Sequence, residues 1–311
     1  MTLLLGRIEV SAMRSIELVT RIAPLGLRFW DPVSEALVRG GLRVAAYPAG
    51  RPAQRVAAFA NRSGTYVFTD LPDLRDVLSG ADAAYWAEPP ATRTFVVEVT
   101  DQEERFLPTT FTVAAPTRGA VPVPSVGSPP FGPPGIPLYS SPARVVPPGS
   151  AVVRATLQER ANGDREGRPA AWAMVRVRLP DESSACGVAD EQGRVSVVFA
   201  HPSPVLDAVH PPGSPPASAG TSLLNQQWRI DIEAAYDALE PPPTSDVLAV
   251  PPAVVIAGQT PRQLWADAAG TRPLGSPTLT FGKELVLRSV DPTKVPPERP
   301  QLFIEPPVTP P

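Results

Sequence analysis

Apolar and polar residues alternate in many short runs along this chain. A period of two places every second side chain on one face of an extended strand, so each run predicts a half-buried β-strand. Such runs lie at residues 42–47, 66–68, 95–100, 111–113, 153–158, 172–179, 195–199, 227–234 and 285–287. Turn signals separate several of them, at Asn61–Gly64, Asn162–Asp164 and Asp190–Gly193. The pattern predicts an all-β chain of antiparallel β-sandwiches.

Two segments lie outside the predicted sandwich strands. Residues 73–87 carry Leu74, Val77 and Leu78 on one face and predict a short helix. Residues 1–22 keep a period of two in two places. They predict an N-terminal arm or edge strand, which pairs either with its own domain or with a neighbouring subunit by strand addition. The apolar positions of this arm are Ile8, Val10, Ile16 and Leu18.

Proline divides the chain into two domains. The sequence holds 43 prolines and 22 glycines in 311 residues, and proline is excluded from helix interiors and central strands. Proline-rich sequence predicts a linker at 117–149, an insertion at 201–219 and a tail at 291–311, leaving sandwiches at 23–116 and 150–290. The linker is either a semi-rigid spacer or a docking segment. Its apolar anchors would be Phe131, Ile136, Leu138 and Tyr139.

Charge and cysteine content limit the partners and the compartment. The formal net charge of −3 provides no basic field for nucleic acid or anionic lipid. Cys186 is the only cysteine, which excludes an intramolecular disulfide. Residues 1–7 lack the basic and apolar regions of a signal peptide, and no apolar run is long enough to insert into a membrane. We expect a protein of the bacterial cytoplasm, released in some cases as part of an extracellular particle.

Candidate catalytic groups are few and scattered. His201 and His210, with Asp207 between them, form a conceivable metal pair, but two solvated loop residues are the simpler interpretation. Cys186 has no basic neighbour in sequence and reads as an incidental thiol. The acidic pairs 181–182 and 190–191 fit turns, where carboxylates accept local hydrogen bonds. We therefore predict no catalytic residue, no metal and no cofactor.

A candidate protein interface lies on the run 172–179. Trp172 and Met174 fall on the face opposite Val175 and Val177, and Arg176 and Arg178 share that outer face. Solvated faces are the default for arginine, and tryptophan usually lies in a core. If this face points outward, however, its aromatic and arginine side chains are typical of protein interfaces.

The first domain resembles a carboxypeptidase-regulatory-like, or transthyretin-like, domain. The resemblance lies in the strand beginning at Gly41 and in a Gly-x-Tyr-x-Phe strand closed by Leu-Pro, followed by the strand at 94–99. The motif positions are Gly64, Tyr66, Phe68, Leu71 and Pro72. It covers roughly 80 residues and implies a β-sandwich, but this module occurs with many functions.

Two further resemblances concern the rest of the chain. Residues 187–199 look like a strand segment of Ig-like sandwiches. Segments 105–108, 170–177 and 187–202 together are similar to accessory proteins of phage-tail-like contractile injection systems. The resemblance implies a non-enzymatic structural or adaptor component, such as a cap, collar or baseplate-associated protein. Its partners would be other subunits of a large assembly, in an oligomer or ring.

Two other functions remain open from the sequence. One is a module that binds carbohydrate or a cell surface, which exposed tryptophans and tyrosines over a shallow groove would support. The other is an enzyme with a regulatory sandwich, which requires a pocket containing His201, His210 and a carboxylate.

Overall fold

A computed structural model describes residues 25–72, 74, 92–116, 121–122, 135–161, 167–203, 225–239, 256–290 and 298–307. Strands dominate it, as the alternating runs predicted. The helical pieces of this described part are a 3-10 turn, η1 (Pro52–Gln54), and two helical ends, at 225 and at 256–257. No described helix has the length and apolar character needed to cross a membrane. The predicted arm at 1–22 and, except for Leu74, the predicted helix at 73–87 fall outside the described residues.

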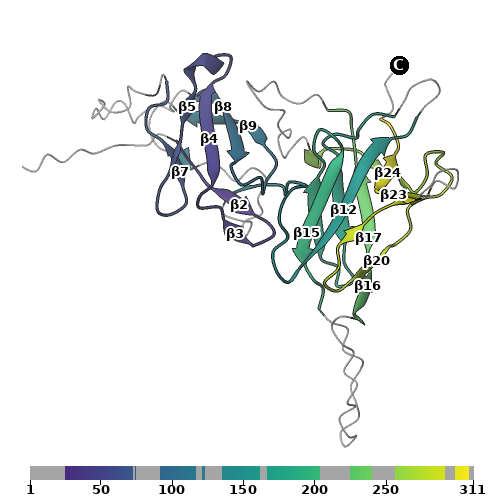
Figure 1. The fold of residues 1–311 in the computed structure, drawn as a ribbon. Helices are drawn as coiled ribbons and strands as arrows, with labels where there is room; N and C mark the ends of the chain where they lie inside the picture. The colour runs from purple at the N-terminus through teal and green to yellow at the C-terminus, as the bar shows by residue number, and fades with distance from the viewer. Residues whose placement is uncertain are drawn as a thin grey trace, which may run out of the picture.

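The first hydrophobic core lies among three sheets, drawn in purple and blue in Figure 1. The antiparallel sheet β5-β4-β8-β9 contains β4 (Leu42–Pro48), β5 (Val56–Ala57), β8 (Thr92–Asp101) and β9 (Thr109–Pro116). Sheet β10-β1-β7-β6 contains β1 (Leu25–Leu27), β6 (Phe59–Ala60), β7 (Tyr66–Phe68) and β10 (Val121–Pro122). Sheet β11-β2-β3 contains β2 (Phe29–Asp31), β3 (Ala36–Leu37) and β11 (Ile136–Pro137). Four aromatic side chains are almost completely buried in this core: Phe29, Tyr66, Phe68 and Phe95.

The second hydrophobic core lies between two larger sheets, drawn in teal to yellow. Sheet β15-β12-β24-β19 contains β12 (Ser150–Glu159), β15 (Arg194–Ala200), β19 (Leu264–Trp265) and β24 (Gln301–Ile304), and β21 (Leu285–Val286) also pairs with β12. Sheet β14-β13-β17-β18 contains β13 (Met174–Arg178), β14 (Ser184–Val188), β17 (Asp231–Ala235) and β18 (Pro261–Arg262). Two small sheets pair β16 (Gln227–Arg229) with β20 (Thr278–Thr280), and β22 (Ser289–Val290) with β23 (Glu298–Arg299).

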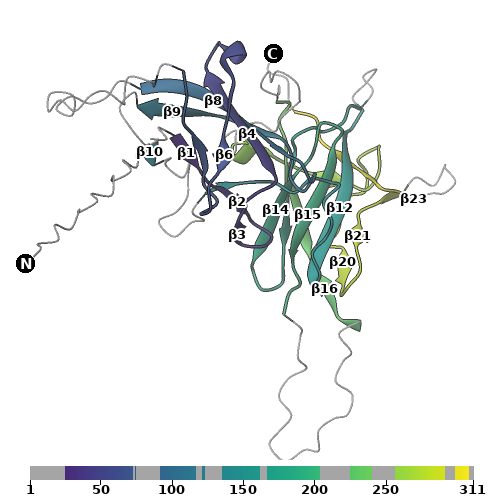
Figure 2. The same ribbon diagram turned by 60° about the vertical axis from the view of Figure 1, so that its left-hand side comes forward.

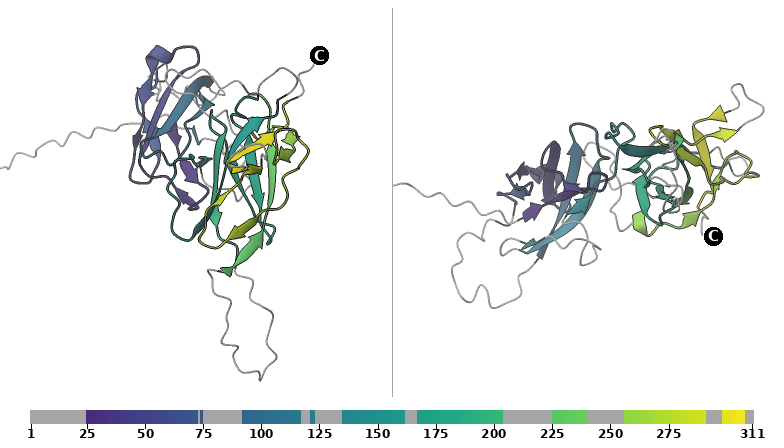
Figure 3. Two further views of the ribbon diagram at one scale, coloured as in Figure 1. Left: turned by 45° about the vertical axis from the view of Figure 1, so that its right-hand side comes forward. Right: turned by 90° about the horizontal axis from the view of Figure 1, so that it is seen from below.

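The two groups of strands lie side by side, as Figure 2 and the view from below in Figure 3 show. All the sheets in the described part are antiparallel or mixed. Parallel pairs join β1 to β10, β2 to β11, and β12 to both β21 and β24. The wholly antiparallel pairing that the sequence suggested is therefore incomplete.

Four turns share one hydrogen-bonding pattern. The side chain of Asn61, Asp101, Asp190 or Asp267 accepts a hydrogen bond from the backbone N–H four residues later. The residue three positions after it has a positive φ, which favours glycine. These residues are Gly64, Glu104, Gly193 and Gly270. The pattern explains why the predicted turns at 61–64 and 190–193 form: a short polar side chain satisfies the backbone while glycine permits the bend.

Three predicted boundaries differ from the structure. The run 227–234 splits at Ile230 between β16 and β17, which belong to different sheets. Val121–Pro122 and Ile136–Pro137, which lie in the predicted linker, pair with β1 and β2. Each is a two-residue edge strand, where a missing N–H is tolerated. Residues 301–304, expected in a tail, form β24 inside the second core, where Leu302 and Ile304 are fully buried.

Candidate functional site: the seam between the two cores

A third apolar cluster connects the two cores. It consists of the buried residues Leu107, Trp172, Val188 and Ile256, with Tyr139, Ala171, Met174 and Leu239 packed against them. We call this cluster the seam. Leu107 lies just before β9 of the first core, whereas Trp172 and Val188 adjoin β13 and β14 of the second. Apolar side chains buried between two bodies favour one relative arrangement of those bodies.

The end of the predicted linker supplies one wall of the seam. We call residues 135–149 the strap. Its backbone is tied to the first group of strands, because Leu138 N–H donates to the carbonyl of Trp30 and Leu107 N–H donates to the carbonyl of Tyr139, each at 2.9 Å. The side chain of Leu138 is 1% exposed in the first core, and Tyr139 is half-buried in the seam. For this part of the linker the structure favours the docking alternative over the spacer. Phe131 lies outside the described residues.

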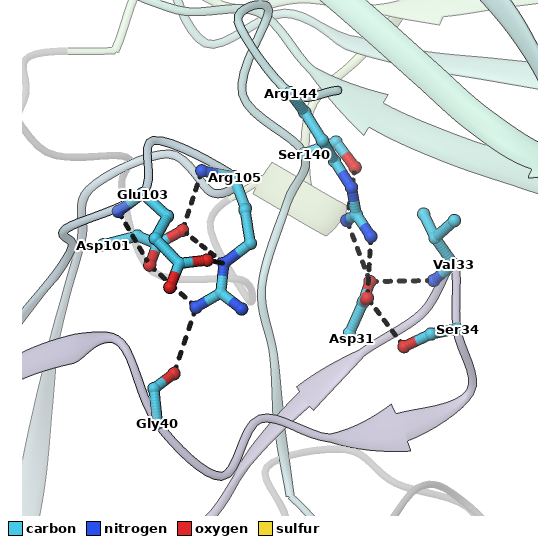
Figure 4. Close-up of polar contacts among 9 residues, drawn as sticks. All are labelled: Asp31, Val33, Ser34, Gly40, Asp101, Glu103, Arg105, Ser140 and Arg144. Atoms are coloured by element: carbon cyan, nitrogen blue, oxygen red, sulfur yellow. Dashed lines mark hydrogen bonds and ion pairs between the residues drawn. The ribbon is translucent and has the colours of Figure 1, made fainter. Parts of the chain in front are cut away.

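A buried ion pair fastens the strap to β2 (Figure 4). Arg144 donates from Nη1 to Asp31 Oδ1 at 2.9 Å and from Nη2 to Asp31 Oδ2 at 2.7 Å, and both residues are less than 10% exposed. Asp31 also accepts from the N–H of Val33 and from the hydroxyl of Ser34, and Arg144 also donates to Ser140 Oγ. The carboxylate and the guanidinium thus have several partners, which a buried charge requires.

The electrostatics of Asp31 follow from these contacts. Burial on its own raises the pKa of Asp31, but hydrogen bonds from Arg144 and Ser34 and the positive charge of Arg144 outweigh burial. The pKa of this carboxyl therefore lies below its ordinary value. Asp31 is ionised at neutral pH, and the pair acts as a charged, bidentate clamp.

A second clamp shapes the turn that leads into the seam (Figure 4). Arg105 donates from Nε to Asp101 Oδ2 at 3.0 Å and from Nη2 to Asp101 Oδ1 at 2.9 Å, and Nη2 also reaches the carbonyl of Gly40. The guanidinium groups of Arg105 and Arg144 lie 5.3 and 5.1 Å from the centroid of the Phe106 ring. The chain is thereby fixed immediately before Leu107.

Trp172 enters the seam in an unusual backbone conformation. Its φ is +65°, a region that bulky residues rarely adopt. Gln259 holds the bend, because its Nε2 donates to the carbonyl of Trp172 at 3.0 Å and its Oε1 accepts from the N–H of Met174 at 3.2 Å. Gln259 is itself 5% exposed. Backbone strain of this kind persists only where surrounding contacts determine the conformation.

Trp172 and Met174 therefore do not form the exposed patch that an outward-facing strand face would have given. Trp172 is 3% exposed and Met174 is half-buried. Both belong to the seam, so the first group of strands and the strap cover this end of the β13 face. Arg178 remains exposed further along β13 and pairs with Glu233 at 2.9 Å.

Arg176 lies opposite Cys186 in the β13–β14 ladder. A hydrogen bond to Cys186 raises the pKa of Arg176. The thiol therefore has a basic neighbour across the ladder, which sequence spacing could not show. Cys186 is exposed on β14.

A cleft of about 650 Å³ opens beside the seam. Its walls include Asp101, Glu104, Asp190, Glu191 and Glu284, together with two arginines, Arg154 and Arg194. Several of these groups already have partners: Arg194 pairs with Asp190 at 2.8 Å and Arg154 with Glu284 at 2.9 Å. Among the described residues, no group of three histidine, cysteine or acidic side chains is placed to hold a metal ion. The carboxylate of Asp190 accepts hydrogen bonds from the backbone of its own turn, as predicted for the acidic pair at 190–191.

His201 is not the solvated loop residue that we expected. Its ring stacks on Trp228, with centroids 5.8 Å apart, and lies 4.6 Å from the centroid of Phe281. Burial lowers the pKa of His201. The other two members of the conceivable metal group, Asp207 and His210, lie outside the described residues.

The sequence missed the residues that hold the seam together. Asp31 and Arg144 are 113 positions apart, and Gln259 is 87 positions from Trp172, so no local spacing relates them. The sequence did point to other members of the seam: the segments 105–108 and 170–177 contain Leu107, Trp172 and Met174. The arm residues Ile8, Val10, Ile16 and Leu18 lie outside the described residues.

Comparison with known proteins does not assign this chain to a family. No protein-family model matches it. No curated protein matches it either.

Proposed function

We propose that this chain is a non-enzymatic structural or adaptor component of a multi-subunit assembly. Two β-sandwich modules, transthyretin-like and Ig-like, would present their outer faces to other protein subunits. The setting we favour is a phage-tail-like contractile injection particle, in which the chain would serve as a cap, collar or baseplate-associated part. The observation that supports this proposal is the buried seam, which contains Trp172.

A seam of this kind suits an adaptor for a thermodynamic reason. Two bodies on a free linker lose orientational freedom when both bind, and that loss weakens binding. Here the strap is hydrogen-bonded along the first group of strands, and the Asp31–Arg144 pair fixes it again before β12 begins. The relative orientation would thus be largely set before any partner arrives, so two partners would be held at a defined spacing.

Exposed charged side chains remain available on the second body. The sheet β14-β13-β17-β18 exposes Arg178, Asp231 and Glu233, and a groove of about 660 Å³ runs beside them along β13, β17 and β18. Arginine and carboxylate groups on a rigid sheet are suited to oriented contacts with another protein.

Co-sedimentation tests this proposal. The full chain, with an affinity tag, is produced in its own host, and assembled particles are separated from free protein on a density gradient. We expect the chain to sediment with tube and sheath proteins at a fixed ratio. A chain found only in the light fractions, in cells that do assemble particles, would overturn the proposal.

The sugar-binding alternative rests on the sequence alone. Among the described residues, every tryptophan and tyrosine is buried or half-buried, so none offers an open stacking platform. This observation favours the adaptor function over sugar binding.

A further inference from the structure

Among the described residues, no strand pairs with the outer side of the long edge strand of the first group. β9 pairs with β8 in a continuous register from Thr109 to Pro116 and forms the outer strand of the sheet β5-β4-β8-β9. It contains eight residues and no charged side chain. Natural edge strands are usually protected by charge, bulges or short length. β9 has only Pro116, at its end.

The direction of the free groups follows from the ladder. The backbone carbonyl of Thr94 accepts a hydrogen bond from Ala49 N–H, and Gln102 N–H donates to the backbone carbonyl of Gly41. The backbone N–H and C=O groups of the even-numbered residues of β8 therefore point toward β4. The backbone groups of the odd-numbered residues of β8 must then form the hydrogen bonds to β9, and the residues opposite them in β9 are also odd-numbered. The N–H and C=O groups of Thr112 and Ala114 consequently point away from β8. Both residues are exposed.

A second long edge in the described part, that of β15, is closed. β15 is the outer strand of its sheet, but its Ser196 carbonyl lies 2.9 Å from the position of a Cβ built on Gly187 of β14. The absence of a side chain at Gly187 lets β14 cover that edge. The edge strand β14 has five residues, fewer than β9, and the edge strands β5, β6 and β18 have only two residues each.

We propose that the edge of β9 receives the N-terminal segment, residues 1–22, of a second copy of this chain as an added β-strand. This inference rests on the proposed structural function and names one of its partners. The period of two in the segment suits strand addition, because alternate side chains of an added strand face the core. Ile8 with Val10, or Ile16 with Leu18, would then extend the apolar surface beside Phe111, which is half-buried at the margin of the first core.

A second copy is favoured by where the segment joins the fold. β1 begins at Leu25 and lies between β7 and β10, in a different sheet from β9. Both sides of β1 are therefore occupied by other strands, and the described part of the chain begins in a sheet that does not contain β9. A contact between the segment of one copy and the edge of another is heterologous, and it can repeat into a ring or a longer array.

A pair of complementary variants tests the proposal. Deletion of residues 1–22 removes the segment and leaves the edge. Thr112→Pro removes the outward N–H and leaves the bonds to β8, while Thr112→Ala is the matched control that keeps the N–H. Molar mass is measured by light scattering after size exclusion. We expect the intact chain and Thr112→Ala to have molar masses that are multiples of 33.0 kDa. The two interrupted variants, the deletion of residues 1–22 and Thr112→Pro, should each be monomers.

Mixing the two interrupted variants is the decisive step. One provides only the edge and the other only the segment, so we expect one-to-one dimers from two monomeric samples. A monomeric intact chain, oligomers that persist in both variants, or a mixture that stays monomeric would overturn the inference. Circular dichroism confirms that each variant is folded. A monomeric chain that still sediments with particles would refute this inference and leave the proposed function standing.

Discussion

Replacing Arg144 with alanine should destabilise the first group of strands far more than an ordinary ion-pair deletion. The guanidinium is 6% exposed and makes two hydrogen bonds, of 2.9 and 2.7 Å, to a carboxylate that is equally buried. Its removal leaves Asp31 charged and without its main partner. Breaking a buried pair in this way costs about 3–5 kcal/mol.

Arg178→Ala is the matched control. It removes an arginine of the same kind, paired with Glu233 at 2.9 Å, but both partners are about half exposed. Exposed pairs contribute roughly 0–1 kcal/mol. Both variants are unfolded in guanidinium chloride, and tryptophan fluorescence and circular dichroism follow the transitions. If Arg144→Ala lowers the free energy of unfolding no more than Arg178→Ala does, the reasoning that the clamp is buried and essential is refuted.

The pH dependence provides a second test of the same clamp. The pKa of Asp31 is lowered in the folded protein, because its bonds to Arg144 and Ser34 outweigh burial. A group of this kind stabilises the fold above its unfolded pKa, about 3.9, and the stabilisation is lost as pH falls through the folded pKa. The difference in unfolding free energy between the wild type and Asp31→Asn should therefore shrink below about pH 4. A constant difference down to pH 2 would contradict the assignment.

Three further predictions concern the bend, a turn and the histidine. Gln259→Leu should lower the free energy of unfolding by about 1–3 kcal/mol, because it leaves a buried carbonyl and a backbone N–H unpaired. Gln263→Leu, at an exposed position, should change that free energy little, and urea unfolding measures both. Gly193→Ala should lower Tm more than Gly50→Ala, since both have positive φ but only Gly193 lies against a facing carbonyl. Burial lowers the pKa of His201, so its stabilisation is complete above about pH 6.5 and is lost as pH falls. His201→Phe should flatten the decline in Tm between pH 7 and 5, and an unchanged slope would count against this assignment.

The sequence predicted the strands well because their signal is local. A strand has a period of two, so the runs at 42–47, 95–100, 153–158 and 195–199 found β4, β8, β12 and β15. The turns at 61–64 and 190–193 were equally local, since a polar side chain and a glycine three positions later suffice. β24 was missed because it is a four-residue run between prolines, and only its neighbours β12 and β19 make it a core strand.

The seam could not be read from the sequence. Alternation placed Trp172 and Met174 on the outer face of their strand, but periodicity does not say what covers an outer face. The cover comes from Leu107 and the strap, and it depends on Asp31 and Arg144, which are distant in sequence. Contacts between segments so far apart are set by the topology, which a local pattern does not encode.

The central claim is that the seam holds the two groups of strands in one relative orientation. Spin labels at Arg62→Cys and Arg229→Cys, in a Cys186→Ser background, would report the distance between the two bodies by pulsed electron paramagnetic resonance spectroscopy. Trp172→Gly is the informative comparison, because glycine accepts the positive φ while it removes the side chain from the seam. We predict a narrow distance distribution in the labelled parent and a broad one in Trp172→Gly. A broad distribution in the labelled parent would contradict the account.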